Sequence, residues 1–348
     1  MTNHLNAKAA GKQAAAGDTM NAIVQDAYGS FDVLRFGKTA RPRIAENEVL
    51  IRVHAAGMDR GTWHMMTGRP YLLRILGFGF RRPKNNVPGI DVAGTVAAVG
   101  SAVSRFAVGD QVYGMSRGSF AEYAAAPEDK LAHKPSNLSF EQAAAVPISA
   151  GTALQALDAG RVEHGQKVLI LGASGGVGSY AVQLAKSLGA EVTGVSSAGK
   201  ADLVRSLGAD HVLDYATDDF ADGTRRYDLI LDIGGNPKLY RLRRALTPTG
   251  TAVVVGGEEG GKWTGGFGRS LRAPLVSLFV RQRLAMLASR ERASDLERLN
   301  PLLESGAVTP SIDRTYTLDE VPDAMRHLEA GHVRGKIAIR VFSGEAGS

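Results

Sequence analysis

The chain has 348 residues, 44% of them hydrophobic and 22% charged, a composition typical of a globular protein with ample material for a core. It contains no cysteine, which excludes disulfide bonds and thiolate metal sites, and no apolar run reaches the roughly 18 residues of a membrane-spanning helix. The net charge of +6 is modest for this length, and without an aromatic and basic patch it does not indicate a nucleic-acid partner.

The first residues differ from the rest of the chain. Residues 1–19 are small and polar, and they lack the apolar core of a secretory signal. A transit peptide is the alternative, although the segment has no arginine. We predict a disordered N-terminal extension, a fold that begins at Met20, and a cytoplasmic location. The remaining length predicts two domains.

Short strands separated by glycine turns follow. Residues 49–56, 92–99 and 111–113 favour an antiparallel, partly barrel-like sheet. Asp59 precedes a predicted helix around residues 63–66, and we favour a role as its cap over contact with a ligand. The apolar and aromatic loop 67–80 could wall a hydrophobic cleft or be buried under the barrel.

A glycine-rich turn is the most informative motif. An apolar run, residues 168–171, predicts a buried strand, and residues 179–186 have helical spacing. Between them lies Ala173-Ser174-Gly175-Gly176-Val177-Gly178, where glycines permit close approach of a pyrophosphate and the helix N-terminus favours its negative charge. Because Ala173 replaces the first glycine of G-x-G-x-x-G, a tight turn without a ligand is the alternative for the motif alone.

The pattern that follows supports a dinucleotide site. Further strands are predicted at 191–196, 211–214, 227–232 and 250–256, with helices at 200–207 and 238–246 between them. Strands that alternate with short helices predict an α/β fold with a doubly wound parallel sheet.

The end of the second strand of this unit favours NADPH over NADH. A NAD site usually has a carboxylate there, whereas residues 196–200 read Ser-Ser-Ala-Gly-Lys. Asp202 is expected inside the next helix. Serine hydroxyls and the Lys200 ammonium suit a 2′-phosphate, and the alternative is a solvated loop lysine.

Several motifs together resemble the medium-chain dehydrogenases/reductases, over residues 20–341. They are Pro88-Gly89-Ile90-Asp91-Val92-Ala93-Gly94, Val108-Gly109-Asp110, Gly118-Ser119-Phe120-Ala121-Glu122-Tyr123, Ala144-Ala145-Val146-Pro147, Leu207-Gly208-Ala209-Asp210 and Gly331-His332-Val333-Arg334-Gly335-Lys336. The resemblance implies a GroES-like, partly open β-barrel domain from residues 20–145 and 284–348, and a Rossmann domain from residues 146–283. It also implies that the chain ends in a helix from Leu296, a strand at 311–316, a helix at 318–329 and a strand at 336–341.

Many members of that family hold zinc through cysteine and histidine. Here Asp59 and Ile90 stand at two of the corresponding positions, and Ser149 or an immediate neighbour stands at the third. Isoleucine cannot bind a metal, and serine is a poor zinc ligand. We therefore predict no metal. The chain is similar to the zinc-independent quinone oxidoreductase branch, in particular to the reticulon-interacting mitochondrial oxidoreductases and their bacterial relatives. That resemblance implies direct hydride transfer from NADPH to a small hydrophobic quinone or α,β-unsaturated carbonyl compound.

The resemblance also implies roles for individual residues. Four residues of the glycine turn would face the pyrophosphate: Ser174, Gly175, Gly176 and Val177. Three would surround the 2′-phosphate: Ser197, Lys200 and Tyr215. Thr152 would meet the nicotinamide amide, Gly256 would let a strand end approach its ring, and His332, Val333 and Arg334 would close over the cofactor. No catalytic acid is assigned.

The segment 267–287 mixes apolar and basic residues. It could make a peripheral membrane contact, or belong to a NADPH-sensing module with little turnover. We favour a third interpretation, in which it contains the last strand of the Rossmann sheet and pairs across a homodimer.

Overall fold

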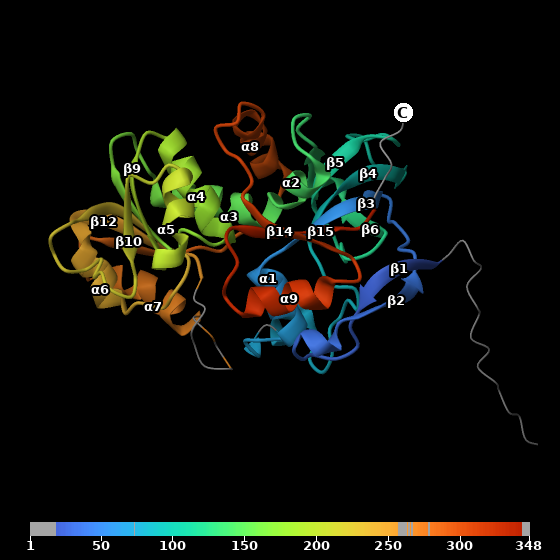
Figure 1. Ribbon diagram of the computed structural model, residues 1–348, viewed down its shortest axis with the longest axis horizontal. Helices are drawn as coiled ribbons and strands as arrows, with labels where there is room; N and C mark the ends of the chain where they lie inside the picture. The colour runs from blue at the N-terminus through green and yellow to red at the C-terminus, as the bar shows by residue number, and fades with distance from the viewer. Residues whose placement is uncertain are drawn as a thin grey trace, which may run out of the picture.

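The computed structural model describes residues 19–72, 74–256, 263, 265, 267–277 and 279–342, which form two large sheets with helices around them (Figure 1). The predicted N-terminal extension lies outside these residues except for Thr19, which begins the first strand. No helix in the described ranges is both long and apolar enough to span a membrane.

A mostly antiparallel sheet contains the strands predicted from the first part of the chain. In the described residues its strands are β3 (Glu48–Met58), β4 (Asp91–Val99), β5 (Gln111–Met115), β6 (Tyr123–Pro127), β7 (Leu131–His133), β14 (Ile312–Thr317) and β15 (Lys336–Arg340). Their order is β14-β15-β3-β4-β5-β7, and β6 pairs with β3. A separate hairpin joins β1 (Thr19–Val24) to β2 (Arg35–Ala40).

The end of the chain returns to this sheet. β15 pairs antiparallel with β3, so that Ile337 lies opposite Met58. Both side chains are buried in one cluster with Ile339. The two chain ends therefore build one domain, as the family resemblance implies.

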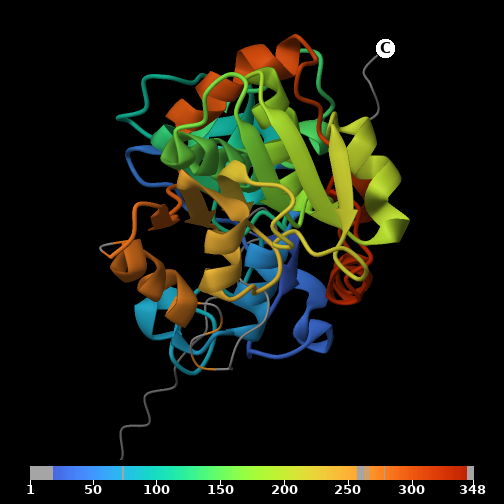
Figure 2. The same ribbon diagram turned by 90° about the vertical axis from the view of Figure 1, so that its left-hand side faces the viewer.

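The second sheet is parallel throughout and faces the viewer in Figure 2. Its strands are β8 (Lys167–Leu171), β9 (Glu191–Ser196), β10 (His211–Asp214), β11 (Tyr227–Asp232), β12 (Leu246–Val254) and β13 (Arg283–Met286). Their order, β10-β9-β8-β11-β12-β13, is the usual one of a dinucleotide-binding doubly wound sheet. The predicted α/β fold is confirmed.

Helices cover both faces of the parallel sheet. The helices described are α1 (Arg60–Thr67), α2 (Phe140–Ala144), α3 (Pro147–Gly160), α4 (Gly176–Ser187), α5 (Ala201–Ser206), α6 (Leu239–Ala245), α7 (Phe267–Ser277), α8 (Ala293–Glu304) and α9 (Val321–Glu329). Alternate residues of β8 point to opposite faces. Val168 and Ile170 are buried with residues of α3 and α4, whereas Leu169 and Leu171 are buried with residues of α6 and α7.

The second predicted domain boundary needs an adjustment. It falls between residues 283 and 284, inside β13, all four residues of which pair with β12. We therefore propose a Rossmann domain that extends to Met286. The segment 267–287 contains α7 and this last strand of the parallel sheet, which the favoured interpretation places here. The pairing across a homodimer stays a prediction.

Candidate functional site

A cavity of about 850 Å³ lies where the parallel strands end. Residues at or just after the carboxyl ends of β8, β9, β11 and β12 line it, including Leu171, Ser196, Ile233 and Val255. This crevice is where doubly wound sheets bind their ligands. Residues of α1 and of the loop before β15 close the opposite side.

The glycine turn forms the floor of this cavity. Gly172 has a φ of +83°, a left-handed conformation that favours glycine. A Cβ on Gly178 would lie 2.1 Å from the carbonyl oxygen of Gly172, so the turn can form only with glycine there. Gly175 precedes α4, whose N-terminus meets the cavity. The backbone therefore forms a cradle that fits a pyrophosphate.

Ten of the twelve predicted cofactor residues line the cavity. They are Thr152, Ser174, Gly175, Gly176, Val177, Ser197, Lys200, Tyr215, Gly256 and Val333. The structure thus brings together residues that are up to 181 positions apart in sequence (333 − 152). Whether they contact a cofactor stays a prediction.

The predicted phosphate lysine also joins the two domains. Lys200 Nζ donates hydrogen bonds to the carbonyl oxygens of Gly331 and Val333, each at 2.8 Å. The loop before β15 is thereby fixed against the corner where Ser197 and the exposed Tyr215 lie.

Two residues expected to close over the cofactor do not line the cavity: His332 and Arg334. Instead, the Arg334 guanidinium donates to the carbonyl oxygen of Gly199 at 2.9 Å and to Asp202 Oδ2 at 2.7 Å. The hydrogen bond from Arg334 lowers the pKa of Asp202. Arg334 therefore fastens the loop from outside, because its long side chain turns toward this carboxylate on α5.

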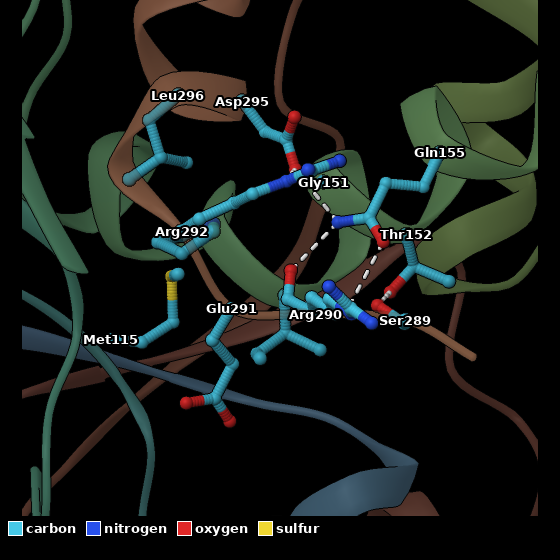
Figure 3. Close-up of a pocket in the computed structure, with 12 residues that line it drawn as sticks. Met115, Gly151, Thr152, Gln155, Ser289, Arg290, Glu291, Arg292, Asp295 and Leu296 are labelled. Atoms are coloured by element: carbon cyan, nitrogen blue, oxygen red, sulfur yellow. Dashed lines mark hydrogen bonds and ion pairs between the residues drawn. The ribbon is translucent and has the colours of Figure 1, made fainter. Parts of the chain in front are cut away.

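Thr152 lines both the large cavity and a smaller one, which is shown in Figure 3. Its hydroxyl oxygen lies 3.3 Å from that of Ser289. One turn later, Gln155 Nε2 donates to the carbonyl oxygen of Arg290 and to Asp295 Oδ2, both at 2.7 Å. These contacts anchor the segment after β13 to α3.

Three charged side chains form a buried cluster beside the cavity. Lys336 Nζ lies 3.0 Å from Asp91 Oδ2 and 3.4 Å from Asp59 Oδ2, and the lysine and Asp91 are each 1% exposed. Burial raises the pKa of Asp91 to about 6, although the Lys336 charge opposes this. Burial by itself would lower the pKa of Lys336, but the two carboxylates raise it above its ordinary value.

Each carboxylate of this cluster also binds the start of a helix. Asp59 Oδ1 accepts from the backbone N–H of Thr62 at 3.0 Å, which confirms its predicted role as the cap of α1. Asp91 Oδ1 accepts from the N–H of Ile148 at 3.0 Å, in the first turn of α3. Two helix N-termini and one ammonium thus balance the two negative charges.

These residues do not fit a zinc site. No cluster of three or more histidine, cysteine, aspartate or glutamate side chains in the described residues could hold a metal ion. The Lys336 ammonium pairs with both nearby carboxylates, Asp91 and Asp59, where a metal would need negatively charged ligands.

The described residues of the loop 67–80 do not line the cavity. Thr67, Gly68 and Pro70 are buried, whereas Ile75 and Phe80 are exposed. The Tyr71 ring packs edge-on against Trp263, with the centroids 5.4 Å apart. The first part of the loop is therefore buried and its later part is largely exposed, and a role of the loop at a hydrophobic cleft stays a prediction.

Sequence reasoning missed several residues of the cavity. Arg241, on α6, lines it while its guanidinium lies over the Phe220 ring and donates to Asp219. Asn236 also lines it. No sequence motif marked these residues. Lys336 was part of a quoted motif, but nothing indicated its partners.

Two family models match the chain. An alcohol dehydrogenase GroES-like domain matches residues 45–136, and a zinc-binding dehydrogenase domain matches residues 207–339. Among solved structures, the quinone oxidoreductase from Coxiella burnetii has a TM-score of 0.83 and 30% identity, covering 93% of this chain and 100% of that chain.

Curated relatives match over most of their length. A 2-methylene-furan-3-one reductase of Solanum lycopersicum is 35% identical, covering 95% of this chain and 84% of the relative. A chloroplastic NADPH-dependent alkenal/one oxidoreductase of Arabidopsis thaliana is 33% identical, with 92% and 79% covered. The mitochondrial NAD(P)H oxidoreductase RTN4IP1 of Mus musculus is 32% identical, with 92% and 89% covered.

Proposed function

The chain belongs to the medium-chain dehydrogenase/reductase superfamily, in its quinone oxidoreductase branch, and from this premise we propose that it reduces quinones or α,β-unsaturated carbonyl compounds with NADPH and without zinc. The observation that carries the proposal is the cavity at the strand ends, which joins a pyrophosphate cradle to a corner with Lys200 and no carboxylate at the end of β9. The names of the relatives describe the same chemistry.

The residues present fit NADPH. When bound, it supplies the two electrons and the hydrogen of a hydride equivalent. Ser174 and the following three residues would bind the pyrophosphate through the backbone at the start of α4. Ser197, Lys200 and Tyr215 would bind the 2′-phosphate, and Thr152 and Gly256 would meet the nicotinamide.

The buried cluster supports zinc independence. A catalytic zinc requires three protein ligands and an open position. Here the Lys336 ammonium already pairs with Asp91 and Asp59, and no neighbouring cysteine or histidine completes a ligand set among the described residues. A quinone or enone suits such a site because the anion formed on reduction is delocalised.

The cavity also supports a hydrophobic substrate. Its apolar lining includes Ile148, Val177, Ile233, Val255 and Leu328. These side chains exclude water and position a small carbonyl compound or quinone.

A substrate panel tests this proposal. Purified protein is assayed with quinones, enones and simple alcohols, each with both nicotinamide cofactors, and its zinc content is measured. We expect reduction of quinones or enones with NADPH, poor activity on alcohols, and no stoichiometric zinc. NAD-linked oxidation of a plain alcohol, with no activity on quinones or enones, would overturn the proposal. Tight NADPH binding without turnover on the whole panel would instead indicate a sensor.

Assembly and location remain proposals. We propose a homodimer joined along β13, which is an edge strand of the described sheet. Leu275 and Phe279 are exposed near it, so vesicle flotation decides whether this segment makes a peripheral membrane contact instead. We also propose a cytoplasmic location, although two relatives carry mitochondrial or chloroplastic names.

A further inference from the structure

Ser149 has an unusual place in the cavity. It lies in the first turn of α3, lines the cavity and is 1% exposed. Its hydroxyl oxygen is buried and has no hydrogen-bond partner in the described part of the chain. Since a buried polar group without a partner costs stability, such a group usually has a functional explanation.

The surroundings of this hydroxyl are shaped by a glycine. A Cβ on Gly176 would lie 3.1 Å from Ser149 Oγ and 3.1 Å from Lys336 Cδ. The hydroxyl therefore lies beside both the glycine turn and the stem of the buried lysine. Thr152 is one helical turn further on, on the same face of α3 and on the same cavity.

Neighbouring polar groups are already engaged. The Thr152 hydroxyl pairs with Ser289, and the Asp59 carboxylate accepts hydrogen bonds from Thr62 and Lys336. Ser149 differs because its O–H can donate to a bound molecule without first losing a partner. The N-terminus of α3 adds partial positive charge at the same point, although Asp91 offsets part of it.

We propose that the Ser149 hydroxyl binds the carbonyl oxygen of the substrate, an inference that rests on the proposed reductase function. As the substrate carbon accepts a hydride equivalent, the carbonyl π electrons move to oxygen and an enolate or hydroquinone anion forms. Ser149 keeps its proton and donates a hydrogen bond to this oxygen. Water supplies the proton that completes the reduction. Ser149 then stabilises the negative charge that develops on this oxygen in the transition state.

The first test compares Ser149→Ala with the wild type. We expect kcat for quinones or enones to fall roughly 100- to 1,000-fold, as for a lost oxyanion donor, while Kd for NADPH is unchanged. Ser149→Thr, which keeps a hydroxyl, should recover part of the rate. The matched control is Ser116→Ala, which removes a buried hydroxyl that donates to the carbonyl oxygen of Ile90 outside the cavity lining. Equal kcat for Ser149→Ala and the wild type would overturn the proposal.

The second test does not require turnover. The probe is 4-nitrophenol, whose absorbance reports its ionisation, bound to NADP⁺-loaded protein. A hydroxyl that stabilises an oxyanion should lower the pKa of the bound phenol in the wild type relative to Ser149→Ala. Equal values, or no binding to the wild type, would overturn the proposal. If the wild type reduces nothing on the panel, the proposed function fails, while this measurement still decides the role of Ser149.

Discussion

At the scale of residues, the site depends on a few charged groups with several partners each. Lys336 holds two carboxylates that come from distant parts of the chain, one at the start of β4 and one before α1. Replacing such a lysine would leave two buried charges without a counter-ion, which is more costly than the pair itself is stabilising. The cluster is therefore sensitive to charge and to pH.

Asp91 predicts a specific dependence of stability on pH. Its pKa rises from an ordinary 3.8 to about 6 on folding, chiefly through burial, so the folded protein binds this proton more tightly than the unfolded chain. Its contribution to the free energy of unfolding is complete below pH 3.8 and is lost as the pH rises through about 6. Relative to Asp91→Asn, the wild type should lose stability over this window, measured by urea unfolding.

The exposed Asp202 provides the control for this prediction. Its pKa is lowered on folding by the hydrogen bond from Arg334, so its contribution is present above 3.8 and is lost only at lower pH. The difference in the free energy of unfolding between the wild type and Asp202→Asn should therefore be flat between about pH 5 and pH 7. Curves for Asp91→Asn and the wild type that run parallel would contradict the assignment.

Lys200 predicts the cofactor preference. Lys200→Ala should weaken NADPH binding more than NADH binding, by roughly the 1.5–3 kcal/mol of a hydrogen bond to a charged group. Because Lys200 also holds the loop before β15, part of the loss will be shared by both cofactors. Arg334→Ala, which loosens the same loop without touching Lys200, measures that shared part. Binding is followed by titration of each nucleotide, and equal losses for both would refute the prediction.

Site residues that belong to a local motif could be predicted from the sequence, whereas contacts between residues far apart in the sequence could not. Ser174 and Gly176 lie where predicted because a glycine turn between a strand and a helix is specified within about ten residues. The Asp59–Lys336 contact joins residues 277 positions apart and depends on the pairing of β15 with β3. The contacts of Arg334 with Gly199 and Asp202 could not be predicted, because a long side chain has several carboxylates and carbonyls within reach.

At the scale of elements, the parallel unit was predicted closely. The strands β9, β10 and β11 have the predicted bounds, since continuous apolar runs bounded by turn residues mark buried strands. β12 begins at Leu246 rather than at residue 250, because pairing with Tyr227 extends it beyond its apolar core. The short edge strand β13 has no pattern of its own, which is why the predicted domain boundary falls inside it.

Replacing each of two helical glycines near the cavity with alanine should change the stability of the fold in opposite directions. At Gly178 a Cβ would meet backbone atoms of Gly172 and Ala173 at 2.1–2.9 Å, so Gly178→Ala should destabilise the fold by roughly 1–3 kcal/mol. At Gly151, inside α3, a Cβ meets nothing within 4 Å, and Gly151→Ala should stabilise by about 0.5–1 kcal/mol. Urea unfolding measures the free energy of unfolding of both variants. If both lose stability by a similar amount, the close approach of Gly178 to the backbone of Gly172 and Ala173 is not what makes glycine necessary there.

At the scale of the whole molecule, the cavity depends on how the two domains are held together. The N–H of Gly335 donates to the carbonyl oxygen of Ser174 at 2.9 Å, which joins the loop before β15 to the glycine turn. Lys200 holds the carbonyl oxygens of Gly331 and Val333 in the same loop, and Arg334 binds the carbonyl oxygen of Gly199. The glycine turn and the corner around Lys200 are thus both connected to the loop before β15, which leads into the GroES-like domain.

The position of β13 at the edge of the parallel sheet predicts a homodimer that is joined along this strand. An edge strand presents N–H and C=O groups that can pair with a second copy, and around a twofold axis the same surface of each copy forms the contact. Met286, at the end of β13, is 37% exposed. Met286→Lys would put one charged side chain from each copy into this contact and should convert a dimer into monomers. Leu188→Lys, which also replaces an exposed apolar side chain of the Rossmann domain, should leave the dimer intact. Sedimentation velocity over a range of protein concentrations measures the oligomeric state. A wild type that is monomeric at all concentrations would contradict the dimer, and a dimer that survives Met286→Lys would place the contact elsewhere.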